Sequence, residues 1–186
     1  MKYFSLDIET SSLTPHPANI LSLALVFEDT ENPLPLEQLP RLHVLLTNPV
    51  KDADNYAVAL NRDLFLARDA VSKGKPAPEG MITAWNTNCS ELKDFITQHH
   101  PSGRAVVAGK NVAGFDLKFL PEHVANLFAH RVLDPGSMYT LPTDKRPPDT
   151  AECCRRAGID DTVTHNALDD ALQVIALIRK HWGISV

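Results

Sequence analysis

The chain has 186 residues, which suits one domain, spanning residues 1–186, with a single hydrophobic core. Its 44% hydrophobic and 22% charged residues are ordinary for a globular protein, and no apolar run is long enough to cross a bilayer, so we expect no membrane partner. The net charge of −5 argues against a protein that binds long duplex nucleic acid. The three cysteines show neither a disulfide framework nor zinc-binding spacing, which favours a reducing, cytoplasmic location.

The N-terminal part of the chain predicts three strands in close succession. Residues 4–10 read Phe-Ser-Leu-Asp-Ile-Glu-Thr, residues 20–27 are almost wholly apolar, and residues 42–46 read Leu-His-Val-Leu-Leu. Short apolar runs bounded by polar, proline-containing turns are typical of buried strands. We therefore expect an antiparallel meander that begins with the strand at residues 4–10.

The remainder of the chain alternates helices with short strands. Apolar residues at three- and four-residue spacing predict helices over residues 55–71, from Asn88 or Ser90 to about residue 100, over 115–129 with a break at Pro121, over 149–157, and over 164–182. Short apolar runs predict two further strands, at 105–108 and 131–133. Strands first, followed by alternating helix and strand, predict an α/β protein in which helices cover a mixed sheet, with residues 4–10 near its centre.

Two carboxylates one residue apart mark the first strand. Side chains at i and i+2 point to the same face of a strand, so Asp7 and Glu9 are expected side by side, with Leu6 and Ile8 on the opposite face. Adjacent like charges are unfavourable unless something neutralises them, and hard divalent cations prefer carboxylate oxygens. The sequence at this point allows either a metal site or a solvated edge strand that carries two acids.

Two further acidic clusters could contribute to the same site. Asp116 follows a predicted strand and turn, at the start of a helix, where α/β sheets present functional groups. His165, Asp169 and Asp170 lie at the start of the final predicted helix. For both clusters the alternative is helix capping, because acids in a first turn interact favourably with the helix dipole.

In combination, these residues resemble the DEDDh branch of the DnaQ-like 3′→5′ exonucleases. Residues 4–10 are similar to the first motif of that family, and Asn111-Val112-Ala113-Gly114-Phe115-Asp116 is similar to the second, Asn-x-x-x-Phe-Asp. His165, followed five residues later by Asp170, is similar to the third. The motifs occur in the family's order and span almost the whole chain. The resemblance implies an RNase H-like fold: a mixed five-stranded sheet, an antiparallel meander followed by parallel strands, with helices on both faces.

The resemblance also implies the chemistry of the site. Asp7, Glu9, Asp116 and Asp170 correspond to the metal ligands of the family, and His165 to its general base. Four carboxylates suit two divalent ions, Mg²⁺ or Mn²⁺. Two such ions about 3.5–4 Å apart can activate the attacking water and stabilise the leaving oxygen of a phosphodiester. A histidine titrating near neutral pH suits removal of the proton from water. Helical periodicity leaves Asp169 and Asp170 as alternatives, and the family's spacing favours Asp170.

Substrate-binding residues are indicated less directly. In the family the backbone after the first motif contacts the terminal nucleotide, which implies that Thr10 and Leu13 line the substrate pocket; ordinary packing is the alternative for Leu13. Asn111 is expected to brace the site. A Gly-Ile-Thr turn found in many members is absent, and residues 55–61 stand in its place, so Asn61 is a further candidate for the substrate groove.

These observations predict a metal-dependent 3′→5′ exonuclease that releases nucleoside 5′-monophosphates from single-stranded ends. A DNA proofreading or repair enzyme is preferred, and an oligoribonuclease-like enzyme acting on short RNA is the alternative. A non-catalytic nucleic-acid-binding module on the same fold is a further alternative. The expected partners are single-stranded DNA or RNA 3′ ends, with a polymerase or a second copy of the chain as additional candidates.

Overall fold

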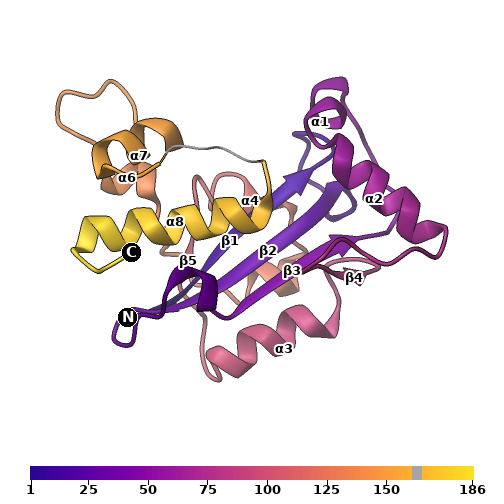
Figure 1. Cartoon of the computed structure of the whole chain (residues 1–186), viewed down its shortest axis with the longest axis horizontal. Helices are drawn as coiled ribbons and strands as arrows, with labels where there is room; N and C mark the ends of the chain where they lie inside the picture. The colour runs from indigo at the N-terminus through magenta and orange to yellow at the C-terminus, as the bar shows by residue number, and fades with distance from the viewer. Residues whose placement is uncertain (161–164) are drawn as a thin grey trace.

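A computed structural model describes residues 1–160 and 165–186. Within this part of the chain, five strands form one mixed sheet in the order β4-β3-β2-β1-β5 (Figure 1). The strands are β1 (Lys2–Thr10), β2 (Ile20–Asp29), β3 (Arg41–Leu46), β4 (Ile82–Ala84) and β5 (Val107–Ala108). The β1–β2 and β2–β3 pairs are antiparallel, whereas the β1–β5 and β3–β4 pairs are parallel. The expected α/β class, the mixed sheet and the antiparallel meander are therefore confirmed.

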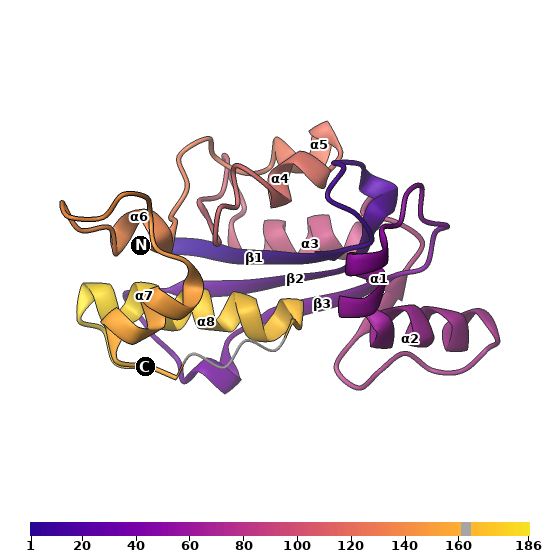
Figure 2. The ribbon, with the colours of Figure 1, turned by 90° about the horizontal axis from the view of Figure 1, so that it is seen from above.

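Helices cover both faces of this sheet. They are α1 (Asn55–Leu60), α2 (Arg62–Ser72), α3 (Ser90–His99), α4 (Asp116–Phe119), α5 (Glu122–Ala125), α6 (Pro135–Met138), α7 (Thr150–Ala157) and α8 (Ala167–Trp182). Figure 2 shows α3, α4 and α5 on one side of the sheet and α7 and α8 on the other. Among the helices described, none combines the length and apolar character needed to span a membrane.

The alternation of side chains along β1 separates two hydrophobic cores. Phe4, Leu6 and Ile8 belong to the core beneath α3, α4 and α5. Tyr3 belongs to the second core, in which Ala171, Ile175 and Ile178 of α8 pack on the sheet. Residues at i and i+2 share a face, so the odd-numbered side chains of β1 point toward α8. Strand β1 thus directs its two acids toward α8 and its apolar residues toward α3.

The helix predicted over residues 55–71 is two helices. Asn61 separates α1 from α2, and its side chain is buried, where its Nδ2 donates a hydrogen bond of 3.0 Å to the carbonyl oxygen of Thr10. A single straight helix would carry the continuous apolar face that the periodicity predicts. Instead, α2 contains no fully buried residue. Asn61, between the two helices, forms a hydrogen bond to the last residue of β1.

The edges of the sheet differ from the prediction. Residues 131–133 were expected to form a strand, but this segment contributes only an isolated bridge between Leu133 and Ala108. The fifth strand is β4, at the opposite edge, which the sequence did not predict. It has three residues, too few to show a two-residue hydrophobic period, and Ile82 is exposed. The break at Pro121 is confirmed, since α4 ends before this proline and α5 begins after it.

Candidate metal centre and active site

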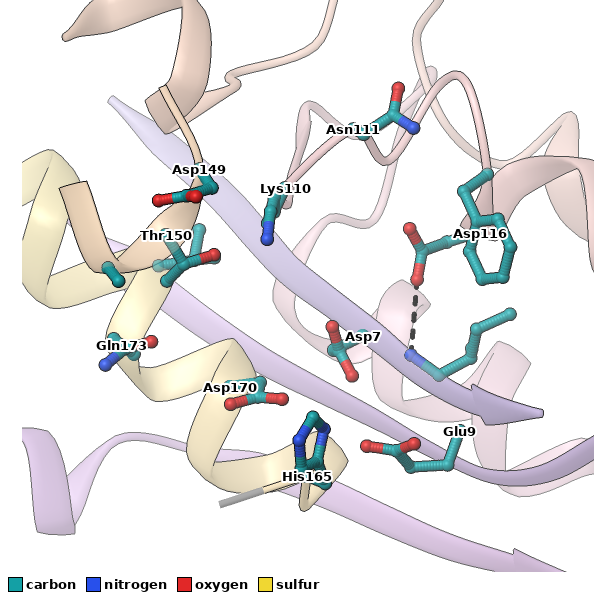
Figure 3. Close-up of a pocket in the computed structure, with 14 residues that line it drawn as sticks. Asp7, Glu9, Lys110, Asn111, Asp116, Asp149, Thr150, His165, Asp170 and Gln173 are labelled. Atoms are coloured by element: carbon teal, nitrogen blue, oxygen red, sulfur yellow. Dashed lines mark hydrogen bonds between the residues drawn. The ribbon is translucent and has the colours of Figure 1, made fainter. Parts of the chain in front are cut away.

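A pocket of about 510 Å³ lies beside β1, between the turn that follows β5 and the start of α8 (Figure 3). Its lining includes all five residues expected to carry the chemistry: Asp7, Glu9, Asp116, His165 and Asp170. They come from three segments that are far apart in the sequence, namely β1, the start of α4 and the start of α8. The fold therefore brings the three sequence motifs into one cavity.

Asp7, Glu9 and Asp170 form the compact part of this cluster. Each offers one carboxylate oxygen, and the three oxygens lie within 4.8 Å of one another. The pleat of β1 brings the first two together, and α8 adds the third from the facing layer. Asp169 is exposed and does not line the pocket, so the structure places Asp170, rather than its neighbour, beside the β1 acids.

Asp116 flanks Asp7 and comes from a tightly bonded turn. Its carboxylate is buried, and its Oδ1 accepts a hydrogen bond of 3.2 Å from the amide of Ile8. The carbonyl oxygen of Asn111 accepts from the amides of Gly114 and Phe115, each at 2.9 Å, which closes the turn immediately before Asp116. The second motif is thus hydrogen-bonded to the backbone of β1, and this bond fixes the position of Asp116 relative to β1.

His165 precedes α8 and is exposed at the pocket. Its imidazole lies in the pocket beside Asp170 (Figure 3). The side chain of Asn166 caps α8 by accepting hydrogen bonds from the amides of Leu168 at 3.0 Å and Asp169 at 3.4 Å. This cap fixes where the helix begins, and it therefore sets the position of Asp170 one turn away.

Backbone strain is concentrated at the same pocket. Among the described residues, the non-glycine residues with positive φ are Asn111, at 52°, and His165, at 50°. Both line the pocket. Such conformations have a modest energetic cost and are found preferentially at functional sites, where the surrounding structure holds them.

The acids of the pocket hold their protons unusually tightly. Burial, reinforced by the nearby charge of Asp170, raises the pKa of Glu9 to about 7. Burial also raises the pKa of Asp116 to about 7, although the amide of Ile8 opposes the shift. The pKa of Asp7 is raised well above its usual value by burial and by the charges of Asp116, Asp170 and Glu9. Burial raises the pKa of Asp170 as well, and the nearby His165 opposes the shift. Ionisation of this cluster is therefore unfavourable near neutral pH, and a bound positive charge would favour it.

The donor set fits a hard divalent cation. Three carboxylate oxygens converge within 4.8 Å, and Asp116 adds a fourth carboxylate on the far side of Asp7. Mg²⁺ and Mn²⁺ prefer oxygen ligands of this kind, and a bound cation would lower the pKa of each acid. Asp7, Glu9 and Asp170 could together hold an ion.

The predicted substrate-binding residues lie around the pocket with different exposures. Asn111 lines it, and its backbone amide donates a 3.1 Å hydrogen bond to Oδ2 of Asp134. Thr10 and Asn61 are both buried and are not among the lining residues. Asn61 instead lies next to Glu9, where its hydrogen bond lowers the pKa of that carboxylate and so opposes the effect of burial. Leu13 is 75% exposed and lies outside the lining. The contacts of these residues with a nucleotide remain predictions.

Four polar residues that the sequence did not single out for the site also line the pocket: Lys110, Asp149, Thr150 and Gln173. Gln173 is three residues after Asp170, and this spacing places both on one face of α8. Lys110 immediately precedes the second motif, so its position beside Asn111 was a signal that sequence reasoning could have used. Thr150 begins α7, and no pattern in the sequence connects that helix with the acids.

Comparison with known proteins assigns no family. The chain matches no protein-family model, and no curated protein matches it at a significant level. The function of the chain is therefore inferred from the residues of the pocket and their geometry.

Proposed function

We propose that this protein is a metal-dependent 3′→5′ exonuclease of the DEDDh type, which releases nucleoside 5′-monophosphates from single-stranded 3′ ends. The observation that carries the proposal is the convergence of four carboxylates and a histidine from three distant segments into one pocket. Any one of these acids could be explained by capping or solvation. Their convergence, with pKa values raised by burial and by mutual repulsion, is unfavourable without a cation and supports a metal site.

The order of the strands supports the same proposal. An antiparallel meander flanked by short parallel strands, with helices on both faces, is consistent with an RNase H-like arrangement. Asp7 and Glu9 lie on β1, an inner strand of the sheet between β2 and β5. Rigid elements on either side hold these side chains, which suits a centre that requires fixed ligand geometry.

The residues of the pocket would share the chemistry as follows. Two bound Mg²⁺ or Mn²⁺ ions would activate the attacking water and stabilise the charge on the leaving oxygen. Asp7, Glu9, Asp116 and Asp170 would hold them. His165 accepts a proton from the water as the water oxygen bonds to phosphorus. The bond from phosphorus to the 3′ oxygen breaks, and the released 3′ oxygen takes up a proton from solvent. The terminal nucleotide leaves with its 5′ phosphate, and the shortened chain keeps a 3′ hydroxyl.

The substrate proposed is a single-stranded end, with DNA preferred and short RNA as the alternative. The net charge of −5 disfavours tracking along a long duplex, because duplex binding draws much of its affinity from basic side chains. A site that accepts one flexible end needs fewer phosphate contacts. A purely binding module is less consistent with a pocket that retains all four acids and the histidine.

The proposal is tested by incubating the protein with 5′-labelled single-stranded DNA and RNA of equal sequence in Mn²⁺, Mg²⁺ or EDTA. Stepwise shortening from the 3′ end that requires metal supports it, and the better substrate identifies the nucleic acid. Shortening that persists in EDTA would contradict the proposed chemistry, as would the absence of activity on both substrates in both metals.

A further inference from the structure

The pocket has a second side, outside the cluster of proposed metal ligands. Lys110, Asp149, Thr150 and Gln173 line it, where the turn after β5 approaches the start of α7 and the middle of α8 (Figure 3). Thr150 and Gln173 contribute neutral hydrogen-bonding groups, whereas Lys110 contributes a positive charge. The described lining therefore combines five carboxylates with one ammonium group, and the mechanism proposed above assigns that group no task.

The backbone on both sides of Lys110 is held firmly. Gly109 packs so closely on β1 that a Cβ atom there would lie 2.7 Å from the carbonyl oxygen of Leu6. On the other side, the amide of Asn111 donates its 3.1 Å hydrogen bond to Asp134. Lys110 thus extends from a fixed point at the end of β5, which limits the region that its ammonium group can reach.

The ammonium group of Lys110 is available to a ligand. Its side chain points toward the acids, and among the residues drawn in Figure 3 it makes no hydrogen bond. It is close enough to oppose the raised pKa values of Asp7 and Asp170, yet it forms no ion pair with the described acids. A lysine that carries three donors and has no partner in a polar pocket is suited to an anion.

A phosphodiester is the anion that this pocket would receive. Its non-bridging oxygens are repelled by the carboxylates, and a cation on the opposite wall offsets that repulsion in a partly desolvated site. We propose that Lys110 donates a hydrogen bond to a non-bridging oxygen of the phosphate that is hydrolysed, and that it keeps this contact in the nucleoside 5′-monophosphate product. This inference rests on the proposed exonuclease function and adds a substrate-contacting residue to it.

Lys110→Met tests the contact, because methionine keeps much of the length and removes the charge. Lys110→Arg keeps the charge and the donors, and Lys93→Met is a matched control, since Lys93 is exposed on α3 on the other side of the sheet. Calorimetry would measure the affinity for deoxyadenosine 5′-monophosphate, and for deoxyadenosine, with Mn²⁺ present. A charge-assisted hydrogen bond of ordinary strength corresponds to a loss of about 10- to 100-fold.

The expected result is that Lys110→Met weakens binding of the monophosphate by that factor and leaves binding of the nucleoside unchanged. Lys110→Arg and Lys93→Met should stay within about threefold of the original protein. Lys110→Met should bind Mn²⁺ alone at least as tightly, because a like charge has left the metal site. Equal monophosphate affinity in Lys110→Met and the original protein would overturn the inference, as would an equal loss of monophosphate and nucleoside, or a loss of Mn²⁺ affinity.

Failure of this inference is distinguishable from failure of the proposed function. An original protein that shortens DNA or RNA with Mn²⁺, together with a Lys110→Met variant that binds the monophosphate normally, removes only the role of Lys110. An original protein that neither binds Mn²⁺ nor shortens either substrate removes the exonuclease proposal, and the role of Lys110 with it.

Discussion

Glu9→Gln should stabilise the metal-free protein at pH 8 while it impairs metal binding. Glutamine has nearly the same shape as glutamate and carries no charge. Glu9 is buried on β1, beside Asp7 and within reach of Asp170, so its ionised form is unfavourable when no cation is present. The substitution therefore tests whether the same carboxylate lowers the stability of the metal-free protein and is needed to bind metal.

The size of the effect follows from the pKa of Glu9, which burial raises from 4.5 to about 7. The folded state holds this proton more tightly than the unfolded state, so its contribution to stability is lost as the pH rises from about 4.5 to about 7. At ~1.4 kcal/mol per pH unit, the ionised carboxylate costs about 3 kcal/mol at pH 8. At pH 5 most of the folded protein is protonated at Glu9, and the substitution should be close to neutral.

Urea unfolding in EDTA at pH 5 and pH 8 would measure the two free energies of unfolding. The matched control is Glu79→Gln, in an exposed loop before β4, which should change stability by less than about 0.5 kcal/mol at both pH values. With Mn²⁺ added, the original protein should gain stability and Glu9→Gln should gain much less. A Glu9→Gln variant that is destabilised by the same amount at both pH values would refute the electrostatic reasoning.

Three further predictions concern named side chains. His165→Ala should lower activity by about 10²–10⁴-fold while Mn²⁺ affinity measured by calorimetry is kept, and an unchanged rate would remove its role as general base. Asn61→Ala should reduce the free energy of unfolding by about 1–3 kcal/mol in urea titrations, because it removes the hydrogen bond to the carbonyl oxygen of Thr10. It should also weaken Mn²⁺ binding, because the hydrogen bond from Asn61 to Glu9 is lost. Unaltered metal affinity would show that Asn61 does not position Glu9. Arg179→Met should lower the free energy of unfolding by about 3–5 kcal/mol, because it leaves Glu28 buried without the guanidinium that lies 2.6 Å away. Arg155→Met, at an exposed ion pair, should lower it by less than about 1 kcal/mol. Equal losses in the two variants would contradict this reasoning.

The sequence predicted the centre of the fold better than its edges. The alternation in residues 4–10 was enough to place Asp7 and Glu9 on one face and Leu6 on the other, because a buried strand has only two faces and its period is fixed. The strand β4 was missed because it is short and half exposed, so its identity comes from pairing with β3 rather than from its own residues. Long-range pairing of this kind is not encoded in a local pattern.

The candidate site shows the same division. Spacing identified the acids and the histidine, and the structure brings them into one pocket. Periodicity could not choose between Asp169 and Asp170, because both lie away from the apolar face of the helix; the way α8 packs on the sheet places Asp170 inside. Asn61 was expected to face the substrate groove, but the break between α1 and α2 turns its side chain inward. Lys110 directly precedes the second motif but was not predicted for the site, and the turn after β5 brings it to the pocket.

The most direct test of the central claim is the identity of the first product. Mass spectrometry of the products formed from a single-stranded oligonucleotide in Mn²⁺, by the original protein and by Asp7→Asn in parallel, would give it. We predict a nucleoside 5′-monophosphate from the 3′ end with the original protein and none with Asp7→Asn. Release of nucleoside 3′-monophosphates, or equal release by Asp7→Asn, would contradict the assignment of a carboxylate-bound metal centre at β1.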